Sequence, residues 1–372
     1  MIIELSVAEL QLRNSDDYIL IDTRETRAYQ NGAIPGAISI PAAELEFGGY
    51  ALPSARELII YCMSGRQSPD IARHLRARGY TAFSLIGGYA AWLLQQTPRP
   101  LQEIENSLRK KFHKSLFSRF TKAVKRYALV QEGDRIAVCI SGGKDSMLMA
   151  KLFQELQRHR QVRFDLTFLV MDPGYNSENR AVIERNAQVL GIPITIFETD
   201  IFEAVAGIKK SPCYLCARMR RGHLYSQAKA LGCNKIALGH HYDDVIETIL
   251  MGMLYGAQVQ TMMPRLPSTN FGDMELIRPL YLIREADIIH FRDYHKLRFI
   301  QCACRFTENC TTCTPDGNVG SKRLEIKQLI QRLKETNPNV EKNIFNSVKN
   351  VNLDTIISYK KDGKIHHFLD SL

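Results

Sequence analysis

A glycine-rich loop is the first segment whose residue types and spacing suggest chemistry. The apolar run Arg135–Ile140 leads into Ser141-Gly-Gly-Lys-Asp-Ser146, and a helical pattern begins at about Asp145. Adjacent glycines let the backbone approach a ligand, and free N–H groups at a helix start bind an oxyanion. An ordinary strand–helix turn is the simpler alternative. We predict a phosphate site made of Ser141, Gly142, Gly143, Lys144, Asp145 and Ser146.

This loop does not follow the Walker A pattern. That pattern needs glycine at 138 and serine or threonine at 145, where the chain has Val138 and Asp145. Two further segments end predicted strands and could face the same ligand. Asp172 ends one of them, and the run from His240 to Asp244 follows the other. We predict that Asp172, His240 and Asp244 lie near a nucleotide or its Mg²⁺, whereas helix capping by Asp243 is the alternative.

A cysteine at the end of a third apolar run is a candidate nucleophile. Residues 57–62 end in Cys62, and a short polar loop containing Arg66 leads into a helical stretch from Ser68. A thiol at this edge of a parallel strand faces a helix N-terminus. The N–H groups there and the charge of Arg66 both favour the thiolate, which is the nucleophilic form. The alternative is a small apolar side chain buried at a strand end.

Other cysteines are spaced as metal ligands. Pro212 favours the first position of a helix, so Cys213 and Cys216 would share one helix face, where a metal can bridge them. A second group comprises Cys302, Cys304, Cys310 and Cys313, and two distant CxxC pairs also suit structural zinc. Cys139 and Cys233 lie in apolar surroundings and are expected in the core.

The elements that position these residues fall on both sides of a proline-rich break. Thr97-Pro-Arg-Pro100 disfavours helix and indicates a linker. On each side of it, apolar runs alternate with helical patterns, which predicts α/β modules with parallel sheets. The region 321–350 also has a helical pattern, and we draw no prediction from the last twenty residues.

The charge is unevenly distributed along the 372 residues. The net charge is −2 over residues 1–98 and +12 over residues 99–372. Residues 101–130 carry eight Lys or Arg against two Glu, and their apolar residues recur every four positions, which predicts one amphipathic basic helix. Its cationic face suits a polyanion such as RNA, and Arg218–Arg221 could add to it; a solvated helix that packs on a core is the alternative.

Several classes of protein are excluded by composition. No run of 18 apolar residues suggests a membrane span, and the N-terminus lacks the basic region of a secretory signal. Nine cysteines without such a signal are expected to be reduced, reactive or metal-bound. We therefore expect a cytoplasmic protein that does not associate with membranes.

Residues 18–92 resemble a single rhodanese domain. The resemblance rests on LIDTRETRAYQNGAIPGAISIP (20–41), the loop CMSGRQS (62–68) and LIGGYAAW (85–92). It implies a persulfide on Cys62, with Arg66 in the loop, and thiosulfate sulfurtransferase activity. Gln67 stands where many members have arginine, so the resemblance leaves the sulfur donor open between a persulfide from a cysteine desulfurase and thiosulfate or sulfide.

The second module resembles the PP-loop ATP pyrophosphatases, and within them the TtcA/TtuA tRNA thiolation group. The resemblance rests on SGGKDS, VMDPGY (170–175), GHHYDDVIETILMGMLYG (239–256), MPRL (263–266) and LIRPLYLIREADI (276–288). It implies ATP and Mg²⁺, a tRNA substrate, and catalytic roles for Lys144 and Asp145. It also implies a [4Fe-4S] cluster on three cysteines, with zinc as the alternative. Cys213 and Cys216 match two ligands; Cys302 or Cys304 is favoured as the third, with Cys310 and Cys313 left open.

Together these observations predict an α/β protein with a rhodanese domain at 1–98, a linker and basic helix at 99–130, a Rossmann-type PP-loop domain at 131–335 and an extension at 336–372. The expected activity is ATP-dependent thiolation of a pyrimidine C2, most simply cytidine 32 of tRNA, with Cys62 as the sulfur supplier. Members of the family often form dimers, so a homodimer is one expectation. The alternatives are a PP-loop enzyme for another tRNA position and a non-catalytic Fe–S or zinc regulator.

Overall fold

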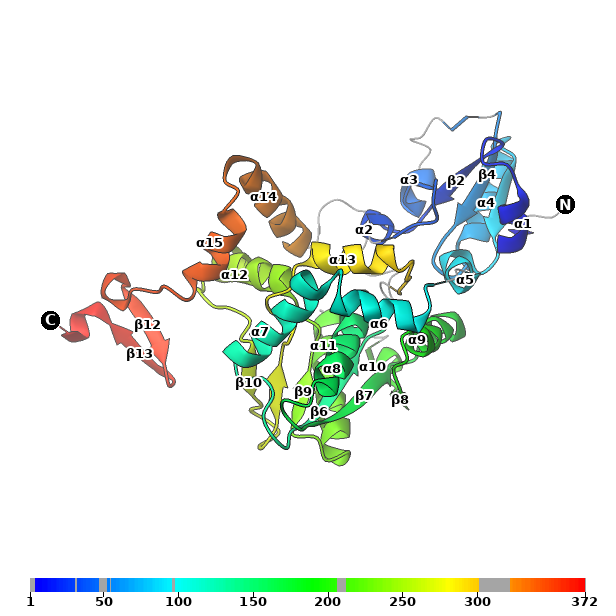
Figure 1. Ribbon diagram of the computed structural model, residues 1–372. Coiled ribbons are helices and arrows are strands. Elements are labelled where there is room, and N and C mark those ends of the chain that lie inside the picture. Colours follow the sequence, from blue (N-terminus) through cyan, green and yellow to red (C-terminus); the bar gives the residue numbers. More distant parts are fainter. Residues whose placement is uncertain are drawn as a thin grey trace. The chain divides into compact units, whose positions relative to one another are not determined.

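The computed structural model describes residues 4–30, 32–46, 52–53, 55–95, 98–205, 212–300 and 322–371. The chain divides into two units (Figure 1). Unit 1 comprises Met1–His241 and Pro264–Val319, and unit 2 comprises Tyr242–Met263 and Gly320–Leu372. In the ranges that the structure describes, no helix has the length and apolar character needed to cross a membrane.

The N-terminal part of unit 1 is a small parallel α/β module. Its five strands lie in the order β1 (Glu4–Leu5), β5 (Ala82–Leu85), β4 (Glu57–Tyr61), β2 (Tyr18–Asp22) and β3 (Ile38–Ser39). The helices are α1 (Val7–Leu12), α2 (Thr26–Gln30), α3 (Ala42–Glu46), α4 (Ser68–Ala77) and α5 (Gly88–Gln95). Alternate residues of β4 enter different clusters of buried side chains, because helices cover both faces of a parallel sheet.

The larger part of unit 1 is built on a six-stranded sheet. Its order is β10 (Arg265–Pro267), β11 (Glu275–Ile277), β9 (Lys235–Ala237), β6 (Arg135–Ile140), β7 (Asp165–Asp172) and β8 (Ile194–Glu198). Only the pair β10–β11 is antiparallel. The helices are α8 (Lys144–Arg158), α9 (Ser177–Val189), α10 (Ile201–Val205), α11 (Pro212–Ala230) and α13 (Glu285–Tyr294). These elements confirm the predicted α/β class for both modules.

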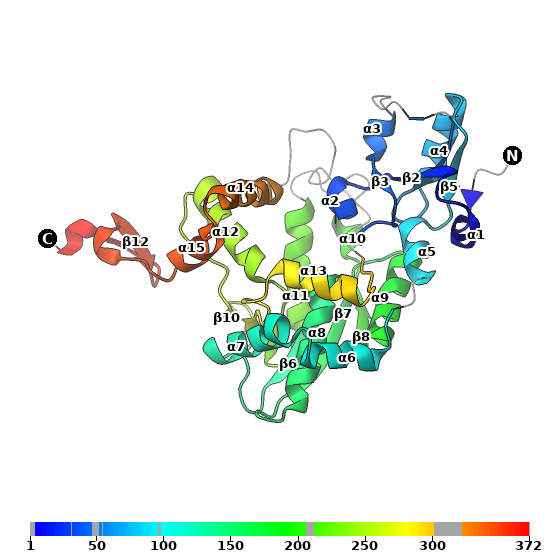
Figure 2. The same ribbon diagram turned by 45° about the horizontal axis from the view of Figure 1, so that its top comes forward.

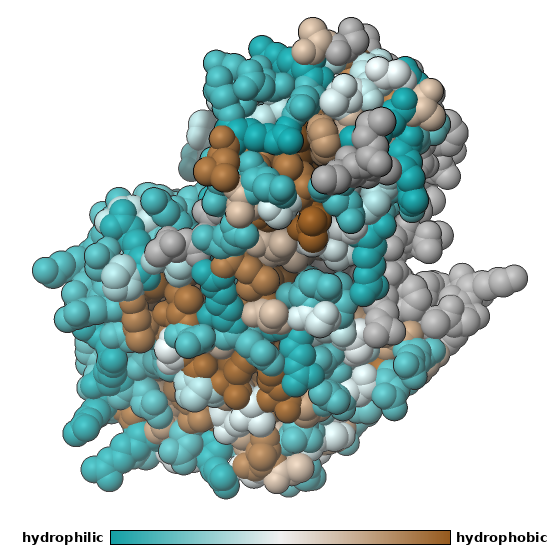
Figure 3. All heavy atoms as spheres, turned by 90° about the vertical axis from the view of Figure 1, so that its right-hand side faces the viewer, coloured by the Kyte–Doolittle hydropathy of each residue, from teal (hydrophilic) through white to brown (hydrophobic). Residues whose placement is uncertain are grey.

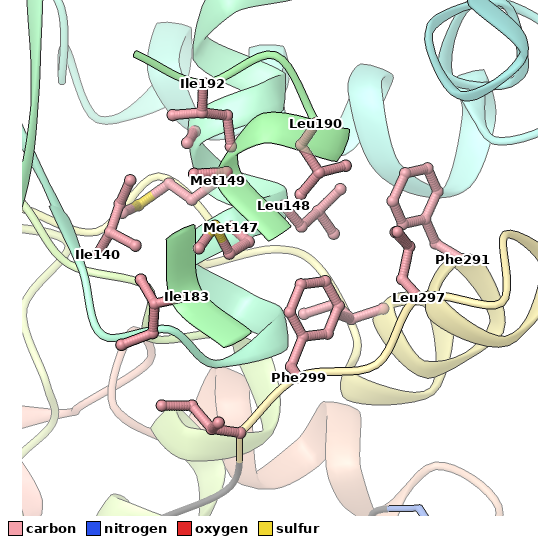
Figure 4. Close-up of a cluster of buried hydrophobic side chains, with 14 of the residues drawn as sticks. Ile140, Met147, Leu148, Met149, Ile183, Leu190, Ile192, Phe291, Leu297 and Phe299 are labelled. Atoms are coloured by element: carbon pink, nitrogen blue, oxygen red, sulfur yellow. The ribbon is translucent and has the colours of Figure 1, made fainter. Parts of the chain in front are cut away.

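From β6 the chain continues to β7 and β8 on one side, and after β8 it crosses back to β9 on the other side of β6, so the strand order reverses at β6. In open α/β sheets, ligands bind outside the carboxyl ends of the strands at such a switch point. The α8 helix begins at this edge of the sheet, directly after the loop that follows β6. Its Met147, Leu148 and Met149 lie among other buried apolar side chains that include Ile140 and Ile183 (Figure 4). The rigid core therefore reaches directly to the loop between β6 and α8.

The basic segment is not the single helix that its periodicity predicts. The structure has α6 (Leu101–Arg109), a π-helical turn at His113–Phe117 and α7 (Ser118–Arg126). The helix breaks after Arg109, at Lys110–Phe112, and the π-helical turn that follows accommodates an extra residue and runs directly into α7. The apolar series is nevertheless buried, as expected of a helix that packs on a core: Leu108, Phe112, Leu116, Phe120 and Val124. Its lysines lie on the outer side, so the segment combines a packed face with a cationic one.

The described part of unit 2 contains three α-helices, two short 3₁₀ helices and a hairpin. The helices are α12 (Tyr242–Gly256), α14 (Lys322–Thr336) and α15 (Val340–Ser347), which confirms the helical pattern predicted for 321–350. Tyr242 and Phe345 stack with ring centroids 4.2 Å apart, and Arg323 pairs with both Asp244 and Glu247 of α12. The strands β12 (Ser358–Lys361) and β13 (Lys364–His367) form an antiparallel pair beyond α15 (Figure 2).

The exposed apolar side chains of unit 1 are scattered. On the face that Figure 3 shows, brown groups of several sizes lie among hydrophilic residues. Leu12 and Ile86 are examples, at 88% and 48% exposure. Isolated exposed apolar residues such as these two are common in globular proteins.

Candidate functional site

The phosphate loop is fixed by its own hydrogen bonds. The helix α8 begins at Lys144, one residue before the predicted start, and Gly143 caps it with extended backbone. Ser141 N donates to Ser146 Oγ over 3.1 Å, and this hydroxyl donates to Gly143 O over 3.1 Å. The two serines thus close the turn from both ends. The first N–H groups of α8 have no partner within the helix, which makes this turn a site for an oxyanion.

Gly142 has a conformation and surroundings that only glycine suits. Its φ is +81°, and a Cβ on it would lie 2.6 Å from Ile183 Cγ1 and 2.9 Å from Ile300 Cδ1. The inner side of the loop is therefore pressed against the core. Gly239 makes a similar approach, since its Cβ would lie 3.1 Å from Ser146 N. Backbone from the end of β9 thus packs against the start of α8.

Lys144 is held between two carboxylates. Its Nζ lies 3.1 Å from Asp145 Oδ2 and 3.1 Å from Glu285 Oε1, and the side chain is 15% exposed. Burial opposes the charge, but the carboxylates of Asp145 and Glu285 outweigh it and raise the pKa of Lys144 above the ordinary lysine value. The ammonium is therefore a fixed positive charge beside the loop.

Asp172 anchors a turn at the neighbouring strand end. Its Oδ1 accepts hydrogen bonds from the N–H groups of Gly174 and Tyr175, over 2.9 and 2.6 Å, and its Oδ2 lies 3.3 Å from Arg180 Nη1. Arg180 also pairs with Glu198 at 2.6 Å. Because β6 and β7 are adjacent and parallel, Asp172 and the phosphate loop lie at the same edge of the sheet.

The histidine pair reaches the same edge from β9. His241 is 5% exposed, and its Nε2 lies 3.9 Å from Asp145 Oδ1. The alternative that Asp243 caps the next helix is wrong, because α12 begins earlier, at Tyr242, and places Asp243 in its first turn. Asp244 belongs to unit 2, where its Oδ1 accepts a hydrogen bond from Arg323 over 3.0 Å.

Cys62 follows β4 directly and is 5% exposed. Ser68, the first residue of α4, donates from its hydroxyl to Cys62 Sγ over 3.6 Å. The loop packs backbone to backbone, because a Cβ on Gly88 would lie 2.3 Å from Cys62 O and one on Gly65 would lie 2.6 Å from Gly87 N. Arg66 is exposed on the same loop. The thiol therefore sits in a rigid turn at a helix start, as its position in the sequence predicts.

A buried ion pair supports this turn from β2. Arg24 and Asp22 are 7% and 0% exposed, and Arg24 Nε donates to Asp22 Oδ1 over 2.9 Å. Tyr61 OH donates to the other oxygen of Asp22 over 2.8 Å, which ties the end of β4 to β2. Arg24 also donates to Gly32 O over 2.8 Å. Asp22 and Arg24, which make these contacts, belong to the triplet Asp22-Thr23-Arg24. The sequence alone did not suggest this role.

The remaining cysteines divide into two groups. Cys139 and Cys233 are buried, and burial together with Cys233 raises the pKa of Cys139 to about 12, which confirms the expected core role. Cys213 and Cys216 are the second and fifth residues of α11, and Cys216 is half-buried. Cys302, Cys304, Cys310 and Cys313 lie outside the described residues. Within the described part, no three metal-binding side chains are grouped.

Comparison with known proteins decides the family. The PP-loop domain model matches residues 112–305, and the rhodanese-like domain model matches residues 6–95. A tRNA-cytidine(32) 2-sulfurtransferase of Citrifermentans bemidjiense is 35% identical over 237 residues, 63% of this chain and 89% of that protein. This chain belongs to the tRNA-cytidine(32) 2-sulfurtransferase family. A relative from Alkalilimnicola ehrlichii is 31% identical over 289 residues, 77% of this chain and 87% of that protein.

Solved structures also resemble this chain, and a tRNA thiolase is one of them. The U34-tRNA thiolase NcsA from Methanococcus maripaludis, solved with its [4Fe-4S] cluster, is 20% identical. The similarity covers 63% of this chain and 79% of NcsA, with a TM-score of 0.49.

Two residues of the site were missed by sequence reasoning. Glu285 pairs with Lys144 from 141 positions away, and Arg180 pairs with Asp172. Glu285 does lie inside the LIREADI segment, so a signal for it existed. Arg180 stands in an ordinary amphipathic helix, and nothing in its pattern distinguishes it from the other charged residues there.

Proposed function

We propose that this chain thiolates C2 of cytidine 32 in tRNA in an ATP-dependent reaction, with residues 131–335 as the thiolation domain and residues 1–98 as the sulfur supplier. The observation that supports the first step most directly is the fixed ammonium of Lys144 at the start of α8. The cytidine C2 oxygen attacks the α-phosphate of ATP, and the bond to pyrophosphate breaks. Negative charge develops on the phosphoryl oxygens, where Lys144 and the first N–H groups of α8 stabilise it.

The side chain of Lys144 is already charged before ATP binds. Binding of ATP would therefore change the partners of this ammonium and not its charge. Asp145 and Glu285 hold the ammonium, and phosphate oxygens would replace one or both. ATP is accompanied by Mg²⁺, which binds phosphates and one or two carboxylates. Asp172 and Asp244 pair with Arg180 and Arg323, so a metal ion would have to displace an arginine at either. Asp145 is part of the loop itself, and its carboxylate contacts the Lys144 ammonium.

In the second step, sulfide attacks C2 and AMP leaves, which gives the 2-thio base. Cys213 and Cys216 would hold two ligand positions of a [4Fe-4S] cluster, because the two residues stand three apart near the start of one helix. By resemblance, the third ligand is Cys302 or Cys304. When bound, a cluster with three cysteine ligands leaves one iron open to hold sulfide.

Cys62 would supply the sulfur as a persulfide. The Ser68 hydroxyl, which donates to Sγ over 3.6 Å, places the sulfur beside the first residue of α4. The Cys62 thiolate would take the outer sulfur from the persulfide of a cysteine desulfurase, whose cysteine leaves as a thiol, or from thiosulfate, which leaves as sulfite. The outer sulfur leaves Cys62 as sulfide when two thiols reduce the persulfide. These thiols supply two electrons and become a disulfide.

The decisive experiment is a nucleoside digest. Anaerobically purified chain is incubated with sulfide, Mg²⁺ and tRNA that lacks the modification, with and without ATP, and the digest is analysed by mass spectrometry. We expect 2-thiocytidine only with ATP, together with equal amounts of AMP and pyrophosphate. A tRNA that carries uridine at position 32 is the matched control. Thiolation elsewhere in the tRNA would favour another PP-loop activity, and no thiolated nucleoside would refute the proposal.

A further inference from the structure

The C-terminal hairpin presents an aromatic and cationic face. Tyr359 is opposite His366 in the register of β12 and β13, and Lys361 is opposite Lys364. Opposed residues of an antiparallel pair, and residues two apart, share one face of the sheet. The rings of Tyr359 and His366 stack with centroids 4.9 Å apart and planes at 13°. One face of the hairpin therefore carries a stacked ring pair next to two lysines.

The other face differs. It carries Lys360 opposite Ile365 and Ser358 opposite His367. The two strands are joined by Asp362 and Gly363, whose φ angles of 50° and 78° match the two-residue turn that Asp-Gly favours in hairpins. The register is thus set by the turn, and the lysine pair next to the tip is held on the same face as the rings.

Nothing among the described residues buries this hairpin. From 346 to 370, no residue is buried, and the three lysines of the hairpin are exposed. A hairpin of two strands is marginally stable in water when it stands alone. The strands themselves carry no acidic residue, and Asp362 in the turn is the single carboxylate from 358 to 367. The surface thus lacks a partner in the described chain and carries the charge that attracts a polyanion.

We infer that this face binds the tRNA substrate, an inference that rests on the proposed function. The stacked pair of Tyr359 and His366 offers a flat aromatic surface on which an unpaired base can stack. Lys361 and Lys364, on the same face, contact phosphates of the RNA strand to which this base belongs. The combination of rings and lysines distinguishes RNA from an acidic protein surface, which would satisfy the lysines and leave the rings without a matching partner.

The test uses the full chain and fluorescently labelled tRNA, with the dissociation constant measured by anisotropy over a series of salt concentrations. The variants are Lys361→Glu with Lys364→Glu, and Tyr359→Ala. Lys360→Glu is the matched control, because it changes the charge of the same strand on the opposite face. Pyrophosphate release at saturating tRNA and persulfide formation on Cys62 verify that each variant is folded.

We expect the double variant to raise the dissociation constant about tenfold or more. It should also reduce the slope of log affinity against log salt by roughly 1.4 to 1.8, the value for two phosphate contacts. Tyr359→Ala should weaken binding about fivefold or more, with little change in the salt slope. Lys360→Glu should have a clearly smaller effect than the double variant.

Each contrary result has a separate meaning. If the wild-type chain binds and thiolates tRNA but the double variant and Lys360→Glu behave alike, the hairpin inference is overturned while the proposed function stands. If the variants keep tRNA affinity but lose sulfur delivery from a protein donor, the face binds a protein, and the inference is again wrong. If the wild-type chain neither binds nor thiolates tRNA, the proposed function itself fails and the inference fails with it.

Discussion

Gly142→Ala tests whether the shape of the phosphate loop, rather than its charge, is required for ATP binding. The substitution adds one methyl group and removes no donor. That methyl group would lie 2.6 Å from Ile183 Cγ1 and 2.9 Å from Ile300 Cδ1, whereas real Cβ atoms essentially never approach closer than 3.0 Å. The loop or these side chains must therefore move by about 0.4 Å or more, the difference between 3.0 and 2.6 Å.

Two effects contribute to the free-energy cost that we expect for Gly142→Ala. A left-handed conformation costs a residue with a Cβ about 1–2 kcal/mol. Overpacking of a filled core adds about 1–3 kcal/mol. Gly133→Ala is the matched control, because Gly133 also has a φ of +81° but would meet nothing within 4 Å. The difference between the two variants therefore isolates the crowding at Gly142 from the strain that both share.

The assay compares amide hydrogen exchange of β6 and α8 in the two variants, together with equilibrium binding of ATP. Exchange reports the stability of this region directly, which suits a chain whose unfolding cannot be assumed to be two-state. We expect Gly142→Ala to lower the opening free energy by about 1–3 kcal/mol relative to Gly133→Ala. ATP affinity should fall in Gly142→Ala alone. Equal exchange in both variants, with unchanged ATP affinity in Gly142→Ala, would refute the reasoning.

Three other changes separate the proposed steps. Lys144→Ala should lower tRNA-dependent pyrophosphate release by about 10²–10³-fold and leave thiosulfate sulfurtransferase activity unchanged; intact thiolation would remove the loop from the mechanism. Cys62→Ser should abolish thiosulfate sulfurtransferase activity but keep thiolation with free sulfide, and if sulfide does not rescue it, Cys62 does more than deliver sulfur. Cys213→Ala should lose the roughly four irons and four sulfides per chain expected after anaerobic purification, whereas stoichiometric zinc without iron in the wild type would contradict the cluster.

The parts of the fold that sequence predicts well are those whose signal is local. The strand Arg135–Ile140 has the predicted bounds, and α8 begins one residue from its expected start, since an apolar run and two glycines mark both ends. The same holds for Cys62, whose position between a strand and a helix follows from the apolar run before it. In each case a few neighbouring residues determine the backbone.

The break in the basic segment shows where this reasoning fails. Apolar residues every four positions predict a continuous helix, and all five are indeed buried. The helix nevertheless breaks at Lys110–Phe112 and resumes with a π-helical turn at His113–Phe117. The four-residue spacing is compatible with either path, because it places side chains on one face without specifying the number of residues in each turn. Packing against the core, not periodicity, decides the backbone here.

The C-terminal hairpin was missed for a different reason. Asp362-Gly363 is a strong local signal for a two-residue turn, and the structure has that turn. The flanking segments, however, lack the apolar alternation by which a half-buried strand is recognised, because neither face of the hairpin meets a core. The alternation of apolar and polar residues in a strand arises because one of its faces is buried. When both faces of a hairpin are exposed, the alternation is missing, and the turn residues are the only signal left in the sequence.

The surroundings of Lys144 could not be predicted from the loop itself. The ammonium lies between the adjacent Asp145 and Glu285, which comes from a helix 141 positions later in the chain. A motif gives the type of group that binds phosphate, but the charge state of that group depends on carboxylates that the fold brings to it. Here these carboxylates keep Lys144 charged before any nucleotide binds. The loop therefore has a positive charge beside it before ATP binds. When ATP binds, its phosphate oxygens need only replace the carboxylate oxygens of Asp145 and Glu285 around the ammonium.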